Sequence, residues 1–331
     1  MLNAKAKLSQ DIFKKTIEMQ STRQGYGEGL VIAGEENDQV VVLCADLTDS
    51  TKSNFFKDKF PDRFIEIGVA EQALATIAAG MANYGKIPFI SSYAAFSPGR
   101  NWEQIRTTIA LNNVPVKIAG AHAGISVGPD GATHQALEDI ATMRAMPNMI
   151  VVYPSDAIEA KKAMVEAAKN GKPTYIRLAR EKTPQFTTDA TPFAIGEAIT
   201  LWEEHDPQVA IIACGPLVYE ALLAARELAK KKIPSIVIDV HTIKPIDEQA
   251  IVKAARMAGA VVTVEEHQIT GGLGGAVAEV LSRNHPTPQE FIGMPDHFGE
   301  SGDPDQLLKK YKMKSEHIIE AAKKVITRKN S

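Results

Sequence analysis

Apolar residues along the chain gather in short runs that are separated by longer amphipathic stretches. In the first half, these runs show little polar alternation, which is typical of strands covered on both faces of a sheet. The runs are residues 39–46, 63–69, 87–93, 114–123, 149–156 and 173–180. Helix-like stretches lie between them at residues 70–85, 101–113, 134–146 and 156–171. This alternation predicts a mostly parallel sheet with helices on both faces.

The alternation stops at residues 183–193, TPQFTTDATPF, where prolines and threonines replace most aliphatic side chains. We interpret this segment as a linker and divide the chain into domains 1–187 and 188–331. The β-α pattern then resumes, with strands at residues 208–215, 233–240 and 260–267 and helices at 219–232, after 247, at 271–283 and at 315–328. The sequence therefore predicts an α/β fold with two doubly wound domains, the second of them smaller.

Composition and charge exclude several classes of protein. The formal net charge is −3, and without a basic excess we expect no nucleic acid partner. The two cysteines, Cys44 and Cys214, lie in separate apolar runs, so neither a zinc site nor a disulfide framework is indicated. No apolar run approaches the roughly 18 residues of a membrane span, and the first residues lack the apolar core of a signal peptide. We expect a cytoplasmic protein that does not enter a membrane.

Polar and aromatic side chains follow several of the predicted strands. In open α/β sheets, ligands bind at the carboxyl ends of the strands. An acid, an aromatic ring, an imidazole or a guanidinium stands at that end of five strands: Asp46, Glu71, Tyr93, His122 and Arg180. Because these groups are chemically complementary, the sequence predicts one ligand site at this edge of the sheet.

Glu71 opens a predicted helix whose next residues, QALATIAAGMA, are almost all small and apolar. One interpretation is a helix-terminal acid, because the helix dipole favours a carboxylate there. The other is a buried functional acid that holds or passes a proton. The residue alone leaves both interpretations open.

The stretch GPDGATHQALED, residues 128–139, carries more chemistry than a connecting loop requires. Asp130 and His134 lie in it, and His122 lies just upstream. Other features are weaker. GGLGG at residues 271–275 lacks the GxGxxG spacing of a dinucleotide site, so we expect it to serve helix packing. His241 and His267 are interpreted as structural or interface residues.

Several segments together resemble a known family. Residues 62–85, 91–106 and 121–144 resemble the pyrimidine-binding domain of transketolase, and residues 238–249 and 261–280 resemble its C-terminal domain. The resemblance runs from about Gln20 to the last helix. GVAEQ alone would fit the wider thiamine-diphosphate superfamily, whereas GVAEQ together with GPDGATHQ is specific. It implies a pyrimidine-binding domain at 1–187 and a transketolase C-terminal domain at 188–331.

The resemblance assigns roles around the cofactor thiamine diphosphate. Glu71 matches the glutamate that hydrogen-bonds N1′ of the aminopyrimidine, which makes it a catalytic residue rather than a helix cap. Tyr93 takes the position of the aromatic residue that stacks on the pyrimidine, and Phe96 lies close by. Most relatives have phenylalanine where this chain has Tyr93, so its hydroxyl needs a partner. Asp46 matches an acid near the cofactor.

The resemblance also assigns the substrate site. His122, Asp130 and His134 match residues that hold sugar hydroxyls, and the two imidazoles would move protons because histidine titrates near neutral pH. Without the resemblance, Arg23 would be interpreted as a solvated arginine on a helix. With it, a second group of residues matches those that grip the sugar phosphate: Arg23, Arg180 and, as a weaker candidate, Ser50.

A complete transketolase is about twice as long and has an N-terminal domain that binds the diphosphate and Mg²⁺. The GDG motif of that domain, which is followed by an asparagine about 25 residues later, is absent here, and the oxygens of its Asp and of that Asn are the ligands that suit magnesium. The resemblance thus implies that a separate N-terminal subunit holds the diphosphate and the metal, with two copies of each chain. We assign no metal ligand to this chain.

Three alternatives stay open. A deoxyxylulose-phosphate synthase-like enzyme shares the GxTHQ element, but that family is normally one long chain. The β subunit of a 2-oxoacid dehydrogenase has this length but lacks the GPDGATHQ loop. A non-catalytic assembly paralogue is expected to have lost the acids and histidines that this chain retains.

Overall fold

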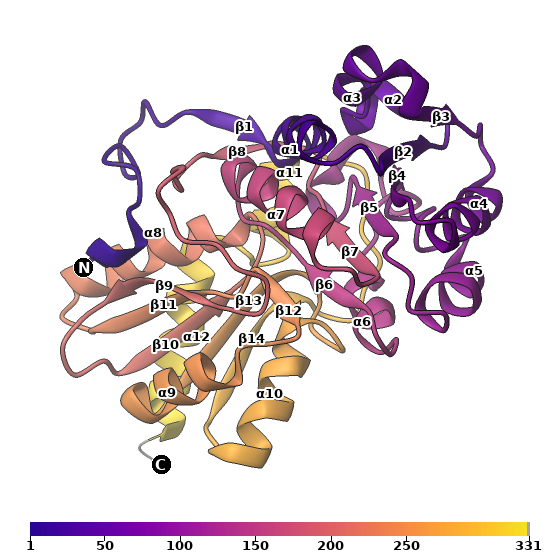
Figure 1. Cartoon of the computed structure of the whole chain (residues 1–331). Coiled ribbons are helices and arrows are strands. Elements are labelled where there is room, and N and C mark those ends of the chain that lie inside the picture. The colour runs from indigo at the N-terminus through magenta and orange to yellow at the C-terminus, as the bar shows by residue number, and fades with distance from the viewer. Residues whose placement is uncertain (330–331) are drawn as a thin grey trace.

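The computed structural model describes residues 1–329, which form two large sheets with helices on both faces of each and a small two-stranded sheet (Figure 1). The first sheet has seven strands in the order β12-β6-β7-β5-β4-β2-β3. They are β2 (Val40–Cys44), β3 (Phe64–Glu66), β4 (Ile87–Tyr93), β5 (Lys117–Ala121), β6 (Ile150–Val152), β7 (Thr174–Arg177) and β12 (Thr242–Lys244). All neighbours are parallel except β12, which comes from the second half of the chain and pairs antiparallel with β6.

Helices α1 (Thr22–Glu36) and α7 (Ala157–Lys169) cover one face of the first sheet, and α4 (Glu71–Asn83) and α6 (Asp139–Arg144) cover the other. The Asp156 side chain caps α7 by accepting the Glu159 N–H at 3.0 Å, and Gly171 follows the helix at φ 65°. α1 and α7 cross closely because Gly25 has no side chain, since a Cβ there would overlap the Ala157 carbonyl. Shorter elements complete this half of the chain: η1 (Ala4–Ala6), α2 (Thr48–Thr51), α3 (Asn54–Lys59), η2 (Pro61–Arg63), α5 (Trp102–Gln104), η3 (Ile105–Ala110) and η4 (Ile125–Asp130).

The second sheet has five strands in the order β14-β13-β10-β11-β9, with only β9 antiparallel to its neighbour. They are β9 (Ile199–Glu203), β10 (Val209–Ala213), β11 (Ser235–Asp239), β13 (Val261–Gln268) and β14 (Gln289–Met294). The helices are α8 (Leu217–Lys230) and α12 (Ser315–Lys329) on one face, α9 (Glu248–Ala258) and α10 (Leu273–Asn284) on the other, and the short α11 (Pro304–Lys310). The predicted fold class, two α/β units with the second smaller, is confirmed.

The two ends of the first predicted domain do not separate simply from the second domain at residue 187. The N-terminal residues pack on the second sheet, where Ile12 is buried and Leu2 forms a β-bridge with Trp202. The chain then enters β1 (Met19–Ser21), which pairs with β8 (Lys182–Pro184) inside the expected linker. The 187/188 boundary stays a prediction, and residues 330 and 331 of the second predicted domain lie outside the described part.

The helix expected at residues 134–146 is shorter than predicted, because α6 begins only at Asp139. Residues before it make other contacts: Ala136 pairs with Ala123 in a β-bridge and accepts a hydrogen bond from Arg177 Nη2 at 2.9 Å. These tertiary bonds replace the helical ones. The other predicted helices and strands are present, both cysteines are buried and unpaired, and no helix within residues 1–329 could cross a membrane.

Candidate functional site

The start of α1 is fixed beside the end of β7. Ser21 caps the helix by accepting the Gln24 N–H at 3.3 Å, and Thr22 Oγ1 accepts the Ala179 N–H at 2.9 Å. The next residue, Arg23, therefore reaches across to two backbone carbonyls. It donates through Nη2 to Arg180 O at 2.6 Å and through Nη1 to Ser50 O.

A pocket of about 980 Å³ opens at this edge of the first sheet. Its walls come from the start of α1 and from the segments that follow β2, β4, β5 and β7. Six residues predicted from the sequence line it: Arg23, Ser50, Tyr93, His122, Asp130 and Arg180. The structure thus brings together the proposed phosphate-binding arginines and most of the proposed sugar-binding groups, although their roles stay predictions.

Two further predicted residues join this group through ring contacts. Tyr93 stacks on His122 with centroids 3.8 Å apart, and Phe96 meets the edge of His134 at 5.3 Å. The Tyr93 and Phe96 rings lie 6.1 Å apart. His134 Nδ1 also lies 2.9 Å from Thr133 Oγ1, which orients its ring. The aromatic residues and the histidines therefore form one continuous wall.

His122 is buried, and its backbone has the left-handed φ of 52°. Burial, with the charges of Arg23 and Arg180 and the nearness of His134, lowers the pKa of His122 to about 3. The expectation that both histidines titrate near neutral pH therefore does not hold for His122. Its imidazole is neutral at physiological pH and can both donate and accept a hydrogen bond.

We expect the NMR signals of the His122 ring to stay unchanged between about pH 5 and pH 8, because the folded-state pKa lies below this range. The measurement is a histidine-selective titration of this chain, with the His122 signal assigned by its loss in His122→Asn. A midpoint close to the ordinary value of about 6.5 would show that the ring is not desolvated as described.

Glu71 is the first residue of α4 and is only 2% exposed. Its carboxylate Oε2 lies 2.7 Å from Nη1 of Arg100, and its carbonyl accepts the Asn101 amide at 2.9 Å. The half-exposed Arg100 guanidinium also lies over the Phe96 ring, 4.7 Å from its centroid. The carboxylate is therefore bound to an arginine beside the aromatic wall and accepts no helix N–H, so the structure favours the buried functional acid.

A predicted residue lies outside the pocket, and several residues of the site were not predicted. Asp46, predicted near the cofactor, is exposed and does not line the pocket, and its N–H donates to Glu66 Oε1 at 2.7 Å. Sequence reasoning missed Arg100, although it stands in the segment 91–106 that carries the family resemblance. It also missed charged and amide groups that line the pocket: Glu18, Gln20, Gln24, Lys52, Glu181 and Lys182.

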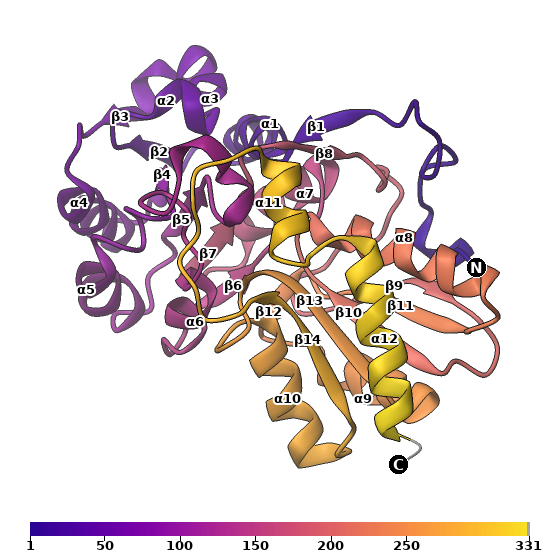
Figure 2. The same cartoon turned by 180° about the vertical axis from the view of Figure 1, so that it is seen from behind.

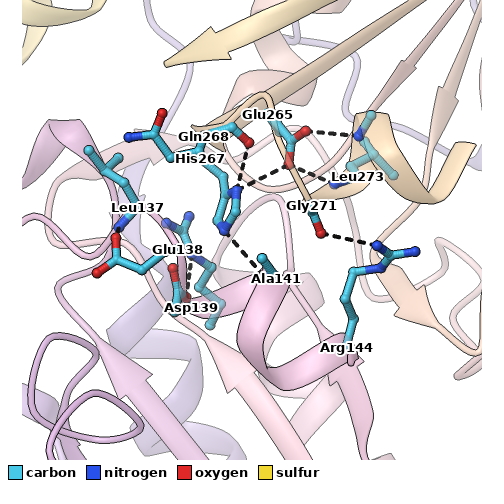
Figure 3. A network of polar contacts seen from close by, with 12 residues as sticks. Leu137, Glu138, Asp139, Ala141, Arg144, Glu265, His267, Gln268, Gly271 and Leu273 are labelled. Atoms are coloured by element: carbon cyan, nitrogen blue, oxygen red, sulfur yellow. Dashed lines mark hydrogen bonds and ion pairs between the residues drawn. The ribbon is translucent and has the colours of Figure 1, made fainter. Parts of the chain in front are cut away.

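The glycine-rich start of α10 is occupied by a carboxylate of the chain itself. Leu273 N–H and Gly274 N–H donate to Glu265 at 2.7 Å and 2.8 Å, and Figure 3 shows this contact beside His267. Burial raises the pKa of Glu265 to about 7, although these donors oppose the shift. The packing interpretation of GGLGG is confirmed, because a bound phosphate would have to displace Glu265.

The two histidines interpreted as structural are buried. His267 Nε2 accepts the Ala141 N–H at 3.3 Å and thereby joins β13 to α6 (Figure 3), and burial lowers its pKa to about 4. The His241 ring stacks on Phe193 with centroids 4.3 Å apart. The His267 contact joins the two predicted domains, whereas the His241 contact joins the second domain to the end of the predicted linker.

The residues present suit the pyrimidine end of thiamine diphosphate. Glu71 offers a buried carboxylate, Phe96 offers an aromatic ring beside the Arg100 that binds this carboxylate, and the Tyr93 ring lies 6.1 Å from that of Phe96. Within residues 1–329, no three His, Cys, Asp or Glu side chains gather as metal ligands.

Comparison with protein families matches both halves of the chain. The model of the transketolase pyrimidine binding domain matches residues 18–185, and that of the transketolase C-terminal domain matches residues 196–318. The chain belongs to the transketolase family. Enzymes of this family generally use thiamine diphosphate and a divalent metal, and the resemblance drawn from the sequence is confirmed over the alternatives.

Three relatives define how much of a transketolase this chain represents. A protein of Methanocaldococcus jannaschii whose name describes a transketolase C-terminal section is 45% identical and covers 89% of this chain and 93% of the relative. A solved split-gene transketolase, described as an inactive beta4 tetramer, is 44% identical with a TM-score of 0.88. The match covers 94% of this chain and 99% of the solved chain. Human transketolase is 36% identical, covers 93% of this chain, and is matched over only 49% of its own length.

Proposed function

We propose that this chain is the C-terminal subunit of a split transketolase. With its partner it transfers a two-carbon ketol unit from a ketose phosphate to an aldose phosphate. The observation that carries the proposal is the pocket itself, which gathers two arginines, an imidazole and a carboxylate at one edge of the sheet. The transketolase names of the relatives with this length add support.

Thiamine diphosphate, when bound, supplies the carbanion chemistry of the reaction. The carboxylate of Glu71 holds the proton at the pyrimidine, and Tyr93 and Phe96 orient that ring. His122, as a neutral imidazole, and Asp130 hydrogen-bond the sugar hydroxyls. His134 is the second imidazole and moves a proton as the carbon–carbon bond breaks or forms.

The phosphate of the sugar binds at the other end of the pocket. Arg23 and Arg180 provide planar donors that suit a phosphate, and Ser50 lies between α1 and the end of β2. In the structure, Arg23 is bound to carbonyls and Arg180 Nη1 to Glu181 at 2.6 Å, so both side chains are held within the pocket wall. A phosphate would replace the carboxylate of Glu181 as the partner of Arg180.

An exposed apolar surface lies on and beside the helices that follow Glu71. Large apolar side chains on and beside α4, α5 and η3 are exposed: Val69, Ile77, Tyr84, Trp102 and Leu111. Figure 1 shows α4 and α5 at the outer side of the first sheet, away from the second sheet. We infer that an N-terminal subunit covers this surface and brings the diphosphate and Mg²⁺ to Glu71, in an assembly with two copies of each chain.

The partner surface can be tested by association. Leu111 is 73% exposed, and Leu111→Glu places a charge in the surface, so we expect at least about a tenfold weaker complex with the N-terminal subunit. The matched control is Met257→Glu, because Met257 is 42% exposed on α9 of the second domain. The measurement is a binding titration with light scattering for the stoichiometry. Equal affinity of Leu111→Glu and wild type would contradict the assigned surface.

Cofactor binding provides the test of the shared site. We expect thiamine diphosphate with Mg²⁺ to bind the mixture of both subunits. Each subunit alone should bind it more weakly than the mixture does. Isothermal titration with this chain, the partner and the mixture separates the cases. Absence of binding in every sample, with the two chains associated, would favour the non-catalytic paralogue.

A further inference from the structure

The loop that carries the predicted sugar-binding residues is covered by a segment of the second domain. We call residues 122–136 the substrate loop and residues 299–304, which lead from β14 into α11, the strap. Figure 2 shows the yellow segment between β14 and α11 running across the first domain. η4 within the substrate loop packs against α11, which continues the strap.

Gln135 stands at the centre of this contact. Its side chain is 4% exposed, and its amide nitrogen faces three backbone carbonyls. They are Ile125 O at 3.2 Å and Gly128 O at 3.4 Å within the substrate loop, and Glu300 O at 2.9 Å on the strap. One buried amide thus joins both arms of the substrate loop to the second domain.

The strap and the loop meet backbone to backbone, with glycines on both sides. The Gly302 N–H donates to Gly128 O at 3.4 Å. A Cβ on Gly131 would lie 2.5 Å from Ser301 Oγ, and a Cβ on Gly299 would overlap Oε1 of Gln135. A methyl group at either position would force the Ser301 or Gln135 side chain to move, so the strap and the loop are closely packed.

The second domain also holds the beginning of the substrate loop. Glu266, on β13, is 1% exposed and accepts the Ser126 N–H at 2.5 Å through Oε1. Asp130 and His134 lie between this contact and Gln135. The residues that reach the pocket are therefore bounded on both sides by groups that fix the backbone.

We propose that Gln135 is a positioning residue and that the strap fixes the substrate loop for binding of the sugar. The expected effect on sugar binding rests on the proposed function, but the expected effect on the conformation of the loop does not. If Gln135 is lost, the loop samples more conformations, and substrate binding has to restore the productive one. None of the predicted catalytic residues comes from the second domain. Through the strap, this domain nevertheless affects the site directly.

The first test replaces Gln135 by leucine, which keeps a similar volume and removes the three hydrogen bonds. We expect faster hydrogen exchange of the backbone amides in residues 124–134, measured on this chain, with little change elsewhere. In the assembled enzyme we expect KM for the sugar phosphate to rise at least about tenfold, with kcat changed less and thiamine diphosphate affinity unchanged. A purely structural role would instead lower the melting temperature and leave KM alone.

The second test inserts a methyl group at the contact. Gly299→Ala should open the loop in the same exchange measurement, whereas Gly275→Ala on α10 is the matched control, since its Cβ would be 3.8 Å from the nearest atom, Arg144 Nη1. In a Gln135→Ala background the methyl group has more room, so Gly299→Ala should increase the exchange rate of the loop by a smaller factor. Unchanged exchange at residues 124–134 in both Gln135→Leu and Gly299→Ala would overturn the proposal. Because exchange requires no substrate, this outcome is distinct from failure of the proposed function.

Discussion

Glu71→Ala is expected to reduce ketol transfer by the two-subunit enzyme at least about a hundredfold, as for loss of a positioned acid–base group. The physical reason is that Glu71 is 2% exposed, and Arg100 is the one side chain within residues 1–329 that binds its carboxylate. The measurement is the steady-state rate at saturating thiamine diphosphate and Mg²⁺.

Two variants separate the chemistry from the packing. Glu71→Gln keeps the shape of the side chain but not its acid, so we expect nearly the same loss of rate. Arg100→Ala removes the 2.7 Å ion pair and leaves the acid, and Arg100 is half exposed, so a much smaller loss is expected. A near wild-type rate for Glu71→Ala would remove Glu71 from the mechanism.

Asp139→Ala is expected to lower the free energy of unfolding by about 3–5 kcal/mol, because it leaves a buried arginine without its counter-charge. Asp139 Oδ2 accepts from Arg177 Nε at 2.8 Å and from the Tyr175 hydroxyl at 2.7 Å, and both members of the ion pair are fully buried. Arg177 also donates to Ala136, so the change should loosen the end of the substrate loop. Urea unfolding of this chain, followed by circular dichroism, measures the loss.

The matched control is the exposed pair of Glu248 and Arg283, for which Glu248→Ala should cost only about 0–1 kcal/mol. Acid dependence gives a second check. Burial alone raises the pKa of Asp139, but Arg177 and His267 beside it lower it below its ordinary value. The stabilisation is therefore present above about pH 4 and is lost as the pH falls through the lowered folded-state pKa. Equal costs for the two substitutions would contradict a buried, paired Asp139.

Local patterns in the sequence predict the helices and strands that are determined by residues close together in the chain. The strands β2 and β10 are uniformly apolar, and α7 has both an Asp156 cap and a following glycine. Contacts between distant segments left no such pattern. β12 joins the first sheet from the second half of the chain, and the strap crosses to the substrate loop. Residues 134–138 looked helical because their spacing is right, yet Gln135 and Ala136 are bound elsewhere.

Several residues of the candidate site could be predicted from the sequence, but Arg100, much of the pocket wall and the electrostatics could not. Strand-end position and the family resemblance led to Glu71, Tyr93 and His122, which the structure places around the aromatic wall. The low pKa of His122 depends on the ring stacked on it and on arginines from other segments, none of which is near it in sequence. Asp46 follows a strand that ends at the same edge, but its side chain is exposed and does not line the pocket, and its place near the cofactor stays a prediction.

The most direct measurement is ketol transfer from xylulose 5-phosphate to ribose 5-phosphate with thiamine diphosphate and Mg²⁺. It compares this chain alone, the N-terminal subunit alone and the two mixed. We predict activity in the mixture only, because this chain carries Glu71 and the pocket, whereas the diphosphate and metal sites are proposed to lie on its partner. Activity of this chain alone would contradict the shared site. Silence of a mixture that binds the cofactor would contradict transfer between these two sugar phosphates.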